Sequence, residues 1–309
     1  QKMSKSIGNA LGLDQMIKDF GADVCRWWVG SISYDNDIKL DVEFLKVAGE
    51  SYRKVRNTLR FLLSNLGEFQ EVDRIPLESI EPTSIDAWVL QQAVAVQQEA
   101  RQQLEQYDFR RAQQSIFDFC NETLSSIYCA AVKDRLYCDA VDSDRRRRTC
   151  TTMHELVHVL IRLLAPMIPH TAEEAWRSFT SDQDALVIDL VHRDVTPIDA
   201  APHWAAVMDL REQCLKQLEQ AKADGIENPL DAGLEIPDPD GALAPFAEDL
   251  ADLMGVSRIT LSAQADSISV IDLSDQPRCE RSWKRDGTVR ERSDGGLLSD
   301  RDAVAVGLE

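Results

Sequence analysis

Apolar residues three and four positions apart run through most of the first two thirds of the chain and constrain its fold most strongly. The longest run is predicted to form a helix from Asp41 to about Leu66. The same spacing predicts helices over 13–20, 22–30, 83–107, 108–139, 148–164 and 204–224, with a further helix starting at 169–174. From Asn228 the period changes and predicts strands at 234–236, 256–261 and 268–273 around a helix at 243–254. The sequence therefore predicts a mainly α protein: a helical bundle with a small C-terminal α+β module.

Charge is unevenly distributed along the 309 residues. The net charge is −19, yet residues 1–70 hold 10 Lys/Arg against 9 Asp/Glu, and residues from 181 onward hold 12 against 27. A strongly acidic chain does not bind nucleic acid through its overall charge, so local basic stripes would have to carry any such contact. The seven cysteines contain no CxxC pair, which favours reduced thiols in a cytoplasmic protein. No apolar run is long enough to suggest a membrane span.

Residues 2–6 read KMSKS and are followed by Gly8. Lys2 and Lys5 place two compact cations three residues apart among small hydroxyl donors, which suits contact with a phosphate chain. Taken by itself, such a segment is better explained as a frayed, lysine-bearing chain end.

The continuation of this motif resembles class I aminoacyl-tRNA synthetases, and within them isoleucyl-tRNA synthetase. The resemblance runs through GADVCRWWVGSISYDNDI, ESYRKVRNTLRFLLSNLGEF, KDRLYCD and LLAPMIPHTAEEAW, in that order, and continues weakly to the C-terminus. The family's HIGH-type loop is absent. We therefore expect the C-terminal part of a longer enzyme, inactive by itself.

The resemblance implies that the whole enzyme activates isoleucine with ATP and Mg²⁺ and transfers it to tRNA(Ile). It implies ATP binding by Lys2, Met3, Ser4, Lys5 and Ser6, with Lys2 and Lys5 catalytic and Lys5 the more important. A monomer is expected. The alternative is a tRNA-binding module without catalysis.

The resemblance also implies a domain order. Residues 1–40 are expected to hold the KMSKS loop and a stem-contact segment, and 41–200 a helical anticodon-binding domain. Residues 201–277 are expected to form a helix with the small α+β module, and 278–309 a degenerate zinc-finger-like tail.

Five polar residues on the predicted helix from Asp41 are candidates for tRNA contact. Arg53, Arg56, Asn57 and Arg60 follow an i, i+3, i+4, i+7 spacing, and Lys54 flanks them. In an isolated helix this would be a solvated face, but in a synthetase the guanidinium forks suit phosphate oxygens. The run Arg145–Arg148 is interpreted as a solvated face, with tRNA contact as the alternative, and Trp27 and Trp28 as core rather than a stacking platform.

Residues 154–158 match HExxH, a zinc-peptidase pattern. The apolar residues around the two histidines favour packing, so the histidines are expected on a helix surface and a peptidase is a distant third hypothesis. Thr171 and Glu174 are predicted to form a capping box. His170 lacks a neighbouring nucleophile and is not assigned as a general base.

The tail departs from the resembled family, whose small zinc module carries two CxxC pairs. The matching positions here are Cys279, Ser282, Ser299 and Asp302, so three of four thiolates are replaced. A structural zinc needs four ligands, preferably thiolate or imidazole, so no metal is expected. Without it, the tail is expected to be the least ordered part, with a small core of Trp283, Val289, Leu297 and Val304.

Overall fold

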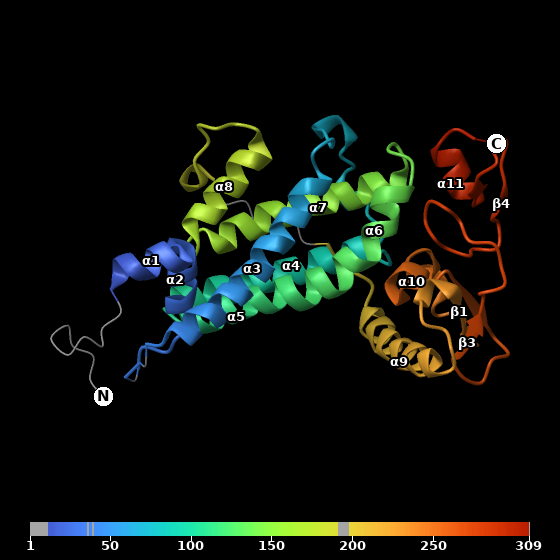
Figure 1. The fold of residues 1–309 in the computed structure, drawn as a ribbon, viewed down its shortest axis with the longest axis horizontal. Coiled ribbons are helices and arrows are strands. Elements are labelled where there is room, and N and C mark those ends of the chain that lie inside the picture. Colours follow the sequence, from blue (N-terminus) through green and yellow to red (C-terminus); the bar gives the residue numbers. More distant parts are fainter. Residues whose placement is uncertain (1–11, 36, 39, 191–197, 309) are drawn as a thin grey trace. The chain divides into compact units, whose positions relative to one another are not determined.

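The computed structural model describes residues 12–35, 37–38, 40–190 and 198–308, and it is mainly helical as predicted (Figure 1). Its packing divides the chain into two compact units. Unit 1 takes residues 1–68, 92–124 and 153–196, and unit 2 takes 69–91, 125–152 and 197–309. The expected domain boundaries were drawn from sequence resemblance rather than from packing, and they stay predictions.

Unit 1 is built from helices whose starts and ends follow the predicted pattern closely. These helices are α1 (Leu13–Phe20), α2 (Ala22–Gly30), α3 (Val42–Asn65), α5 (Phe109–Asp118) and α8 (Pro169–Thr180), with parts of α4 (Ile85–Glu105) and α7 (Asp144–Leu164). Asp41 caps α3 by accepting a hydrogen bond from the backbone N–H of Glu43 at 3.1 Å. On the buried side of α3, Leu45, Val55 and Leu62 are fully buried, as their spacing predicted.

Trp27 lies in the core of unit 1, which confirms the interpretation of this tryptophan as a packing residue. Its side chain is 1% exposed, and its indole N–H donates to Ser51 Oγ at 2.9 Å. The side-chain amide of Gln113, on α5, donates to the backbone carbonyl of Trp27. Trp28 is half-buried and packs at the edge of a small cluster with Met16, Cys25 and Leu45.

The predicted capping box of α8 is wrong. The helix begins at Pro169, and Asp23 from α2 supplies the cap: its carboxylate accepts from the backbone N–H of Thr171 at 2.7 Å and from the Thr171 hydroxyl at 2.6 Å. A carboxylate from another helix thus satisfies the exposed N–H groups of the first turn, a distant contact that local sequence spacing does not reveal.

The predicted continuation of α5 into the KDRLYCD stretch is confirmed, with one difference. Residues Phe119–Tyr128 form a π-helical segment before α6 (Cys129–Cys138) resumes regular α-helical geometry. In a π-helix each backbone hydrogen bond spans five residues instead of the four of an α-helix. The side chains that follow are therefore rotated relative to their positions in a continuous α-helix.

Unit 2 contains the predicted α+β module. The parallel pair β1 (Ala232–Pro237) and β2 (Arg258–Ser262) is connected through α10 (Ala247–Met254), and β3 (Ser269–Asp272) joins β1 antiparallel, giving the strand order β2-β1-β3. The helix α9 (Trp204–Ala223) precedes this sheet.

The tail has a defined fold, with the hairpin strands β4 (Arg290–Glu291) and β5 (Leu297–Leu298) and the short helix α11 (Asp300–Ala305). Its expected core is largely wrong. Trp283 is 59% exposed and Val304 75% exposed, and the buried cluster consists instead of Cys279, Leu298 and Ala303, with Val289 and Leu308 packed against it.

A buried guanidinium connects the helices of unit 2. Arg135, on α6, is fully buried and forms ion pairs with Asp249 and Asp252 of α10 and with Asp86 at the start of α4. Asp249 also accepts from the backbone N–H of Ile85, the first residue of α4, at 2.7 Å. Three buried carboxylates thus share Arg135, while Asp86 also pairs with Arg148, and Asp252 with Lys284 and Arg145.

The interpretation of Arg145–Arg148 as a solvated face is wrong. α7 begins at Asp144 rather than Arg148, so the four arginines lie in its first turns and are only partly exposed. Arg145 binds Asp139 at 2.8 Å, and Arg148 binds Asp86 at 3.1 Å. The remaining two donate to backbone carbonyls. These guanidinium groups are engaged within unit 2.

Among the described residues, no helix combines the length and the apolar character that crossing a membrane requires.

Replacing Arg135 by Met should strongly destabilise the protein. The change removes the ion pairs of Asp86, Asp249 and Asp252 with Arg135, and it takes from Asp249 the one cationic partner that the described residues give it. We therefore expect a loss of about 3–5 kcal/mol in the free energy of unfolding of unit 2. Lys222→Ala is the matched control, because Lys222 forms an exposed ion pair with Glu219 on the surface of α9. Urea unfolding followed by circular dichroism measures both. Equal losses in the two variants would contradict this role for Arg135.

Candidate nucleic-acid interface

The polar face of α3 places the five predicted tRNA-contact residues together. Arg53, Lys54, Asn57 and Arg60 are exposed, and Arg56 is half-buried. Their spacing sets Arg53, Arg56 and Arg60 along one side of the helix, away from the buried Leu45–Leu62 side. The face therefore offers several cationic groups to solvent within two helical turns.

Arg56 has an anionic partner on a neighbouring helix. One of its terminal nitrogens lies 3.1 and 3.2 Å from the two carboxylate oxygens of Glu174 on α8. Both side chains stay substantially exposed, at 40% and 67%. Glu174 therefore lowers the positive potential on this side of α3.

A groove of about 390 Å³ lies between α3 and α8. Arg56 and Arg60 line it from α3, and Glu174 and Ser178 line it from α8. The Tyr52 and Thr171 hydroxyls, 2.8 Å apart, also connect the two helices. The groove runs along the cationic face, so a polyanion lying on α3 would meet polar groups from both helices.

Lys54 is positioned differently from the arginines. Its ammonium group lies 5.9 Å from the ring centroid of Phe117 on α5, which is within the range of a cation–π contact. This contact directs Lys54 toward α5, so the arginines are the stronger candidates for phosphate contact.

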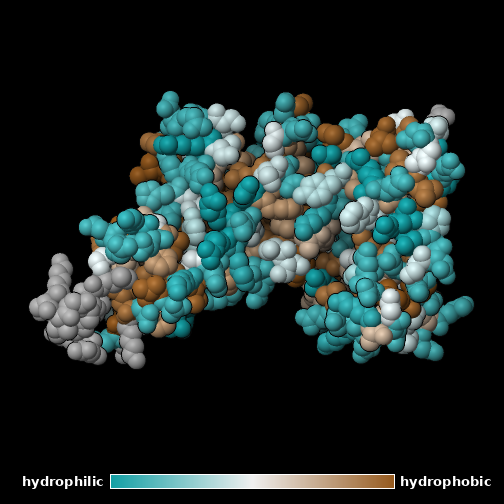
Figure 2. Space-filling model, viewed as in Figure 1, coloured by the Kyte–Doolittle hydropathy of each residue, from teal (hydrophilic) through white to brown (hydrophobic). Residues whose placement is uncertain are grey.

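Exposed apolar side chains gather elsewhere in unit 1, over α1, α2 and the first turns of α3 (Figure 2). They include Leu13, Ile17, Val29, Phe44 and Val47. This surface has the opposite chemistry to the cationic face and is not a candidate for binding a polyanion.

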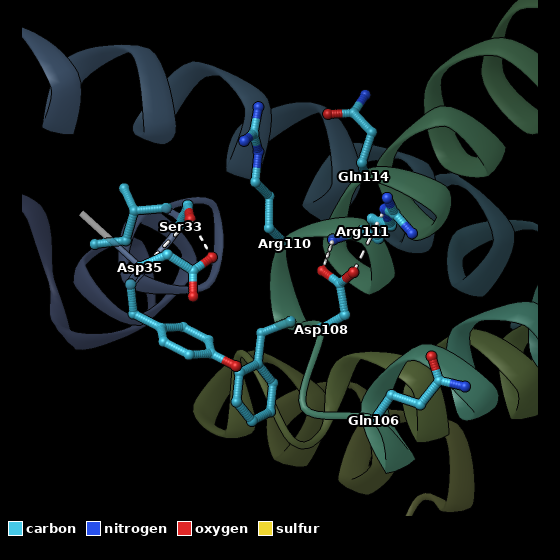
Figure 3. A pocket seen from close by; sticks show the side chains of 10 residues that line it. Ser33, Asp35, Gln106, Asp108, Arg110, Arg111 and Gln114 are labelled. Atoms are coloured by element: carbon cyan, nitrogen blue, oxygen red, sulfur yellow. Dashed lines mark hydrogen bonds and ion pairs between the residues drawn. The ribbon is translucent and has the colours of Figure 1, made fainter.

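A second hollow, of about 620 Å³, lies between the segment after α2 and the start of α5 (Figure 3). Tyr34 and Phe109 contribute aromatic rings, and the Tyr34 hydroxyl donates to the backbone carbonyl of Tyr107 at 3.2 Å. Arg110 extends into the space between the two sides, while Arg111 is 3.4 Å from the Asp108 carboxylate. Aromatic rings beside a guanidinium form a surface on which a nucleobase can stack.

The sequence interpretation missed this hollow. The sequence pattern predicts only that a helix begins at Asp108, and it assigns no role to Tyr34 or Phe109. The signal was the pair of exposed aromatic residues, Tyr107 and Phe109, on both sides of a helix start next to two arginines. Their proximity to Tyr34 depends on the packing of α2 against α5.

The predicted ATP-binding residues Lys2, Met3, Ser4, Lys5 and Ser6 lie outside the described residues. Their assignment stays a prediction.

The two histidines of the HExxH match take part in an aromatic cluster. On α7, the rings of His154 and His158 are 5.1 Å apart, and both approach Phe179 of α8 at 4.8 and 4.9 Å. Glu155 is buried, at 3% exposed. Within the described ranges no group of three or more His, Cys, Asp or Glu side chains is arranged to hold a metal ion. The packing interpretation is supported, although the histidines are half-buried rather than on an open surface.

Two segments of the chain match known protein families. Residues 86–231 match the anticodon-binding domain of tRNA ligase, and residues 1–41 match class I tRNA synthetases of the I, L, M and V group. Asp86 and Arg135 of the buried ion cluster lie in the first range.

Curated relatives extend the similarity over the rest of the chain. Isoleucine--tRNA ligase 1 of Oceanobacillus iheyensis is 33% identical over 99% of this chain and 35% of its own length. Isoleucine--tRNA ligases of Brevibacillus brevis and Desulfitobacterium hafniense are 34% and 32% identical over 91% and 99% of this chain, and 32% and 36% of their own lengths. The chain thus spans about a third of the length of the relatives it matches.

The helical architecture, the matched anticodon-binding domain and the similarity to isoleucine--tRNA ligases over nearly all of the sequence agree, and the chain belongs to the class I aminoacyl-tRNA synthetase family.

Proposed function

We propose that this chain serves isoleucine–tRNA ligation, the ATP-dependent activation of isoleucine and its transfer to tRNA(Ile), and that it supplies tRNA binding and an ATP-contacting loop. The observation that carries the proposal is the 33% identity to an isoleucine--tRNA ligase over 99% of the chain. A monomeric state and a cytoplasmic location are further parts of the proposal. The seven free, buried cysteines agree with a reducing compartment.

The cationic face of α3 is the proposed contact for the tRNA backbone. Arg53 and Arg60 are exposed, and the face includes the half-buried Arg56. The arginines of α7, in contrast, are held by carboxylates and carbonyls of unit 2. Binding phosphate through exposed groups costs no internal ion pair, so α3 is the favoured surface.

Replacing Arg53 or Arg60 by Ala should weaken tRNA binding. Each loss of a phosphate contact should flatten the log–log salt dependence of the binding constant by roughly one unit. Filter binding or fluorescence anisotropy with labelled tRNA at several salt concentrations measures this slope.

Two controls make the test specific. Arg101→Ala removes an exposed arginine that pairs with Glu105 on α4, and should leave the slope unchanged. Glu174→Gln releases Arg56 from its partner and should strengthen binding. If Arg53→Ala and Arg60→Ala give the wild-type slope, the face of α3 is only solvated.

The hollow beside α5 is the proposed place for an unstacked nucleotide of the same tRNA. Tyr34 and Phe109 offer ring faces, and Arg110 offers a cation for the adjoining phosphate. Asp35 and Asp108 add carboxylate acceptors for base amino groups, so the hollow is less cationic than α3 and favours contact with a base.

Phe109→Ala should weaken tRNA binding by roughly 1–3 kcal/mol, the range observed for one lost base–aromatic contact. Because stacking involves no counterion release, the salt dependence should stay near wild type, unlike in the α3 variants. Phe109→Tyr, which keeps an aromatic ring, should restore binding. A Phe109→Ala variant that binds like wild type would rule out this contact.

The KMSKS loop is the proposed ATP contact. In adenylate formation, the isoleucine carboxylate attacks the α-phosphorus and the bond to the bridging oxygen of pyrophosphate breaks. Negative charge then accumulates on the leaving oxygens, where Mg²⁺ and the ammonium groups of Lys2 and Lys5 can offset it.

Lys5→Ala in the complete ligase should slow adenylate formation with little effect on isoleucine binding, because the charge it meets develops mainly in the transition state. By analogy with removal of an oxyanion donor, the loss is roughly 2–4 kcal/mol in transition-state stabilisation. Isoleucine-dependent pyrophosphate exchange measures it, and an unchanged rate would contradict the assignment.

A second candidate is a tRNA-binding module that does not catalyse adenylation by itself. The observation that favours it is that the chain spans about a third of the length of its relatives. Incubating this chain with ATP, isoleucine and labelled pyrophosphate separates the two: exchange supports a catalytic site within it, and tRNA binding without exchange supports the module.

A further inference from the structure

Three tail side chains, two of them 20 and 23 residues away in the sequence, donate to one carboxylate oxygen of Asp302. Oδ2 of Asp302 accepts hydrogen bonds from the Cys279 thiol at 2.9 Å, the Ser282 hydroxyl at 2.6 Å and the Ser299 hydroxyl at 2.8 Å. Asp302 and Cys279 are fully buried, and Ser299 is 1% exposed. The backbone N–H of Asp302 donates back to Ser299 Oγ at 3.1 Å, which caps α11.

These are the four positions at which the resembled zinc module carries its thiolates, and the residues here do not fit a zinc ion. A structural zinc takes four ligands, chiefly thiolate and imidazole, and its cysteines must be deprotonated. Here the Cys279 thiol and the Ser282 and Ser299 hydroxyls each donate a hydrogen bond to the Asp302 carboxylate. The carboxylate oxygen that a metal would need is already occupied by three donors.

The negative charge of Asp302 is offset on its other side. Oδ1 lies 3.2 Å from a terminal nitrogen of Arg301 and 3.8 Å from Nε of Arg281. Arg301 in turn pairs with Asp134 of α6, and Arg281 donates to the backbone carbonyl of Tyr137 at 2.9 Å. A buried carboxylate with three donors and two nearby cations meets the conditions for stable burial.

We propose that the Asp302 carboxylate takes the structural role of a metal ion in this tail, acting as a hydrogen-bonded centre that joins the 279–282 loop to the β5–α11 turn. A segment of about 30 residues cannot bury enough apolar surface to fold by itself, and usually depends on a metal, a disulfide or an added contact. The apolar cluster here is small, with Cys279, Leu298 and Ala303 as its buried members. Charge-assisted hydrogen bonds supply the missing cross-link.

The wider backbone geometry agrees with this role. The N–H of Cys279 donates to the carbonyl of Lys284, and the N–H of Trp283 donates to the carbonyl of Cys279, so the first loop closes on itself. The N–H of Glu280 donates to the carbonyl of Leu297, which brings that loop against β5. Asp302 lies where this loop meets the β5–α11 turn.

The first experiment tests the centre itself. Asp302→Asn in the full chain keeps the side-chain shape but removes the charge and one acceptor oxygen. Amide hydrogen exchange read by mass spectrometry should become at least tenfold faster in residues 279–303, while exchange in α3 and α5 stays at wild-type rates. Asp275→Asn, which removes an exposed carboxylate from the turn before the tail, is the matched control and should change nothing. Equal exchange in the two variants would overturn the proposal.

The second experiment converts the centre back to a metal site. The triple variant Ser282→Cys, Ser299→Cys, Asp302→Cys, together with Cys279, should bind one zinc per chain in native mass spectrometry, and a chelator should lower its melting temperature. The wild-type chain, loaded with zinc under the same conditions, should retain none and should melt at the same temperature with and without chelator. Tightly held zinc in the wild type would overturn the proposal, and so would a triple variant that binds no zinc.

Discussion

The buried guanidinium of Arg135 is the interaction on which the described part of unit 2 most depends. It lies on α6 and reaches two carboxylates of α10 and one at the start of α4, so a single side chain fixes three helices. Removing charges from water is costly, and this cost is met only when every carboxylate keeps its partners. Asp249 does so through the first N–H of α4, and Asp86 through Arg148 and the Tyr128 hydroxyl. The electrostatics of this centre thus determine where α4, α6 and α10 can lie.

Ion pairing also distinguishes two groups of arginines. Those in the first turns of α7 stabilise the fold, whereas those on α3 are available to bind a ligand. The densest basic run in the sequence, Arg145–Arg148, is engaged by carboxylates and carbonyls of unit 2. The less conspicuous stripe on α3 keeps its guanidinium groups largely at the surface, and within the described part of the chain Arg56 is its one arginine paired to an acidic residue. In an acidic chain, the availability of an arginine therefore matters more than the local density of basic residues. This distinction places the proposed tRNA contact on α3.

Local patterns predicted the elements well because helix spacing and turn residues are local properties. The ends of α1, α2 and α3, the Asp41 cap and the mixed module after Asn228 all follow from such patterns. Long-range contacts could not be predicted in this way. The cap of α8 comes from Asp23, 148 residues before Thr171, and the partners of Arg135 lie 49 to 117 residues away.

The tail could be predicted in part. The replacement of three thiolates is visible in the sequence, but the convergence of Cys279, Ser282 and Ser299 on Asp302 is visible only in the fold. The candidate site divides similarly, since the α3 stripe follows from helical spacing and the Tyr34–Phe109 hollow depends on packing.

The central claim is that arginines exposed on α3, rather than those in the first turns of α7, contact tRNA. Arginine-selective modification with a dicarbonyl reagent, with and without tRNA(Ile), tests this most directly when peptides are read by mass spectrometry. The account predicts that Arg53 and Arg60 react readily in the free chain and are protected by tRNA, while Arg145 and Arg148 react slowly in both states. Protection confined to Arg145–Arg148, with Arg53 and Arg60 reacting equally in both states, would contradict it.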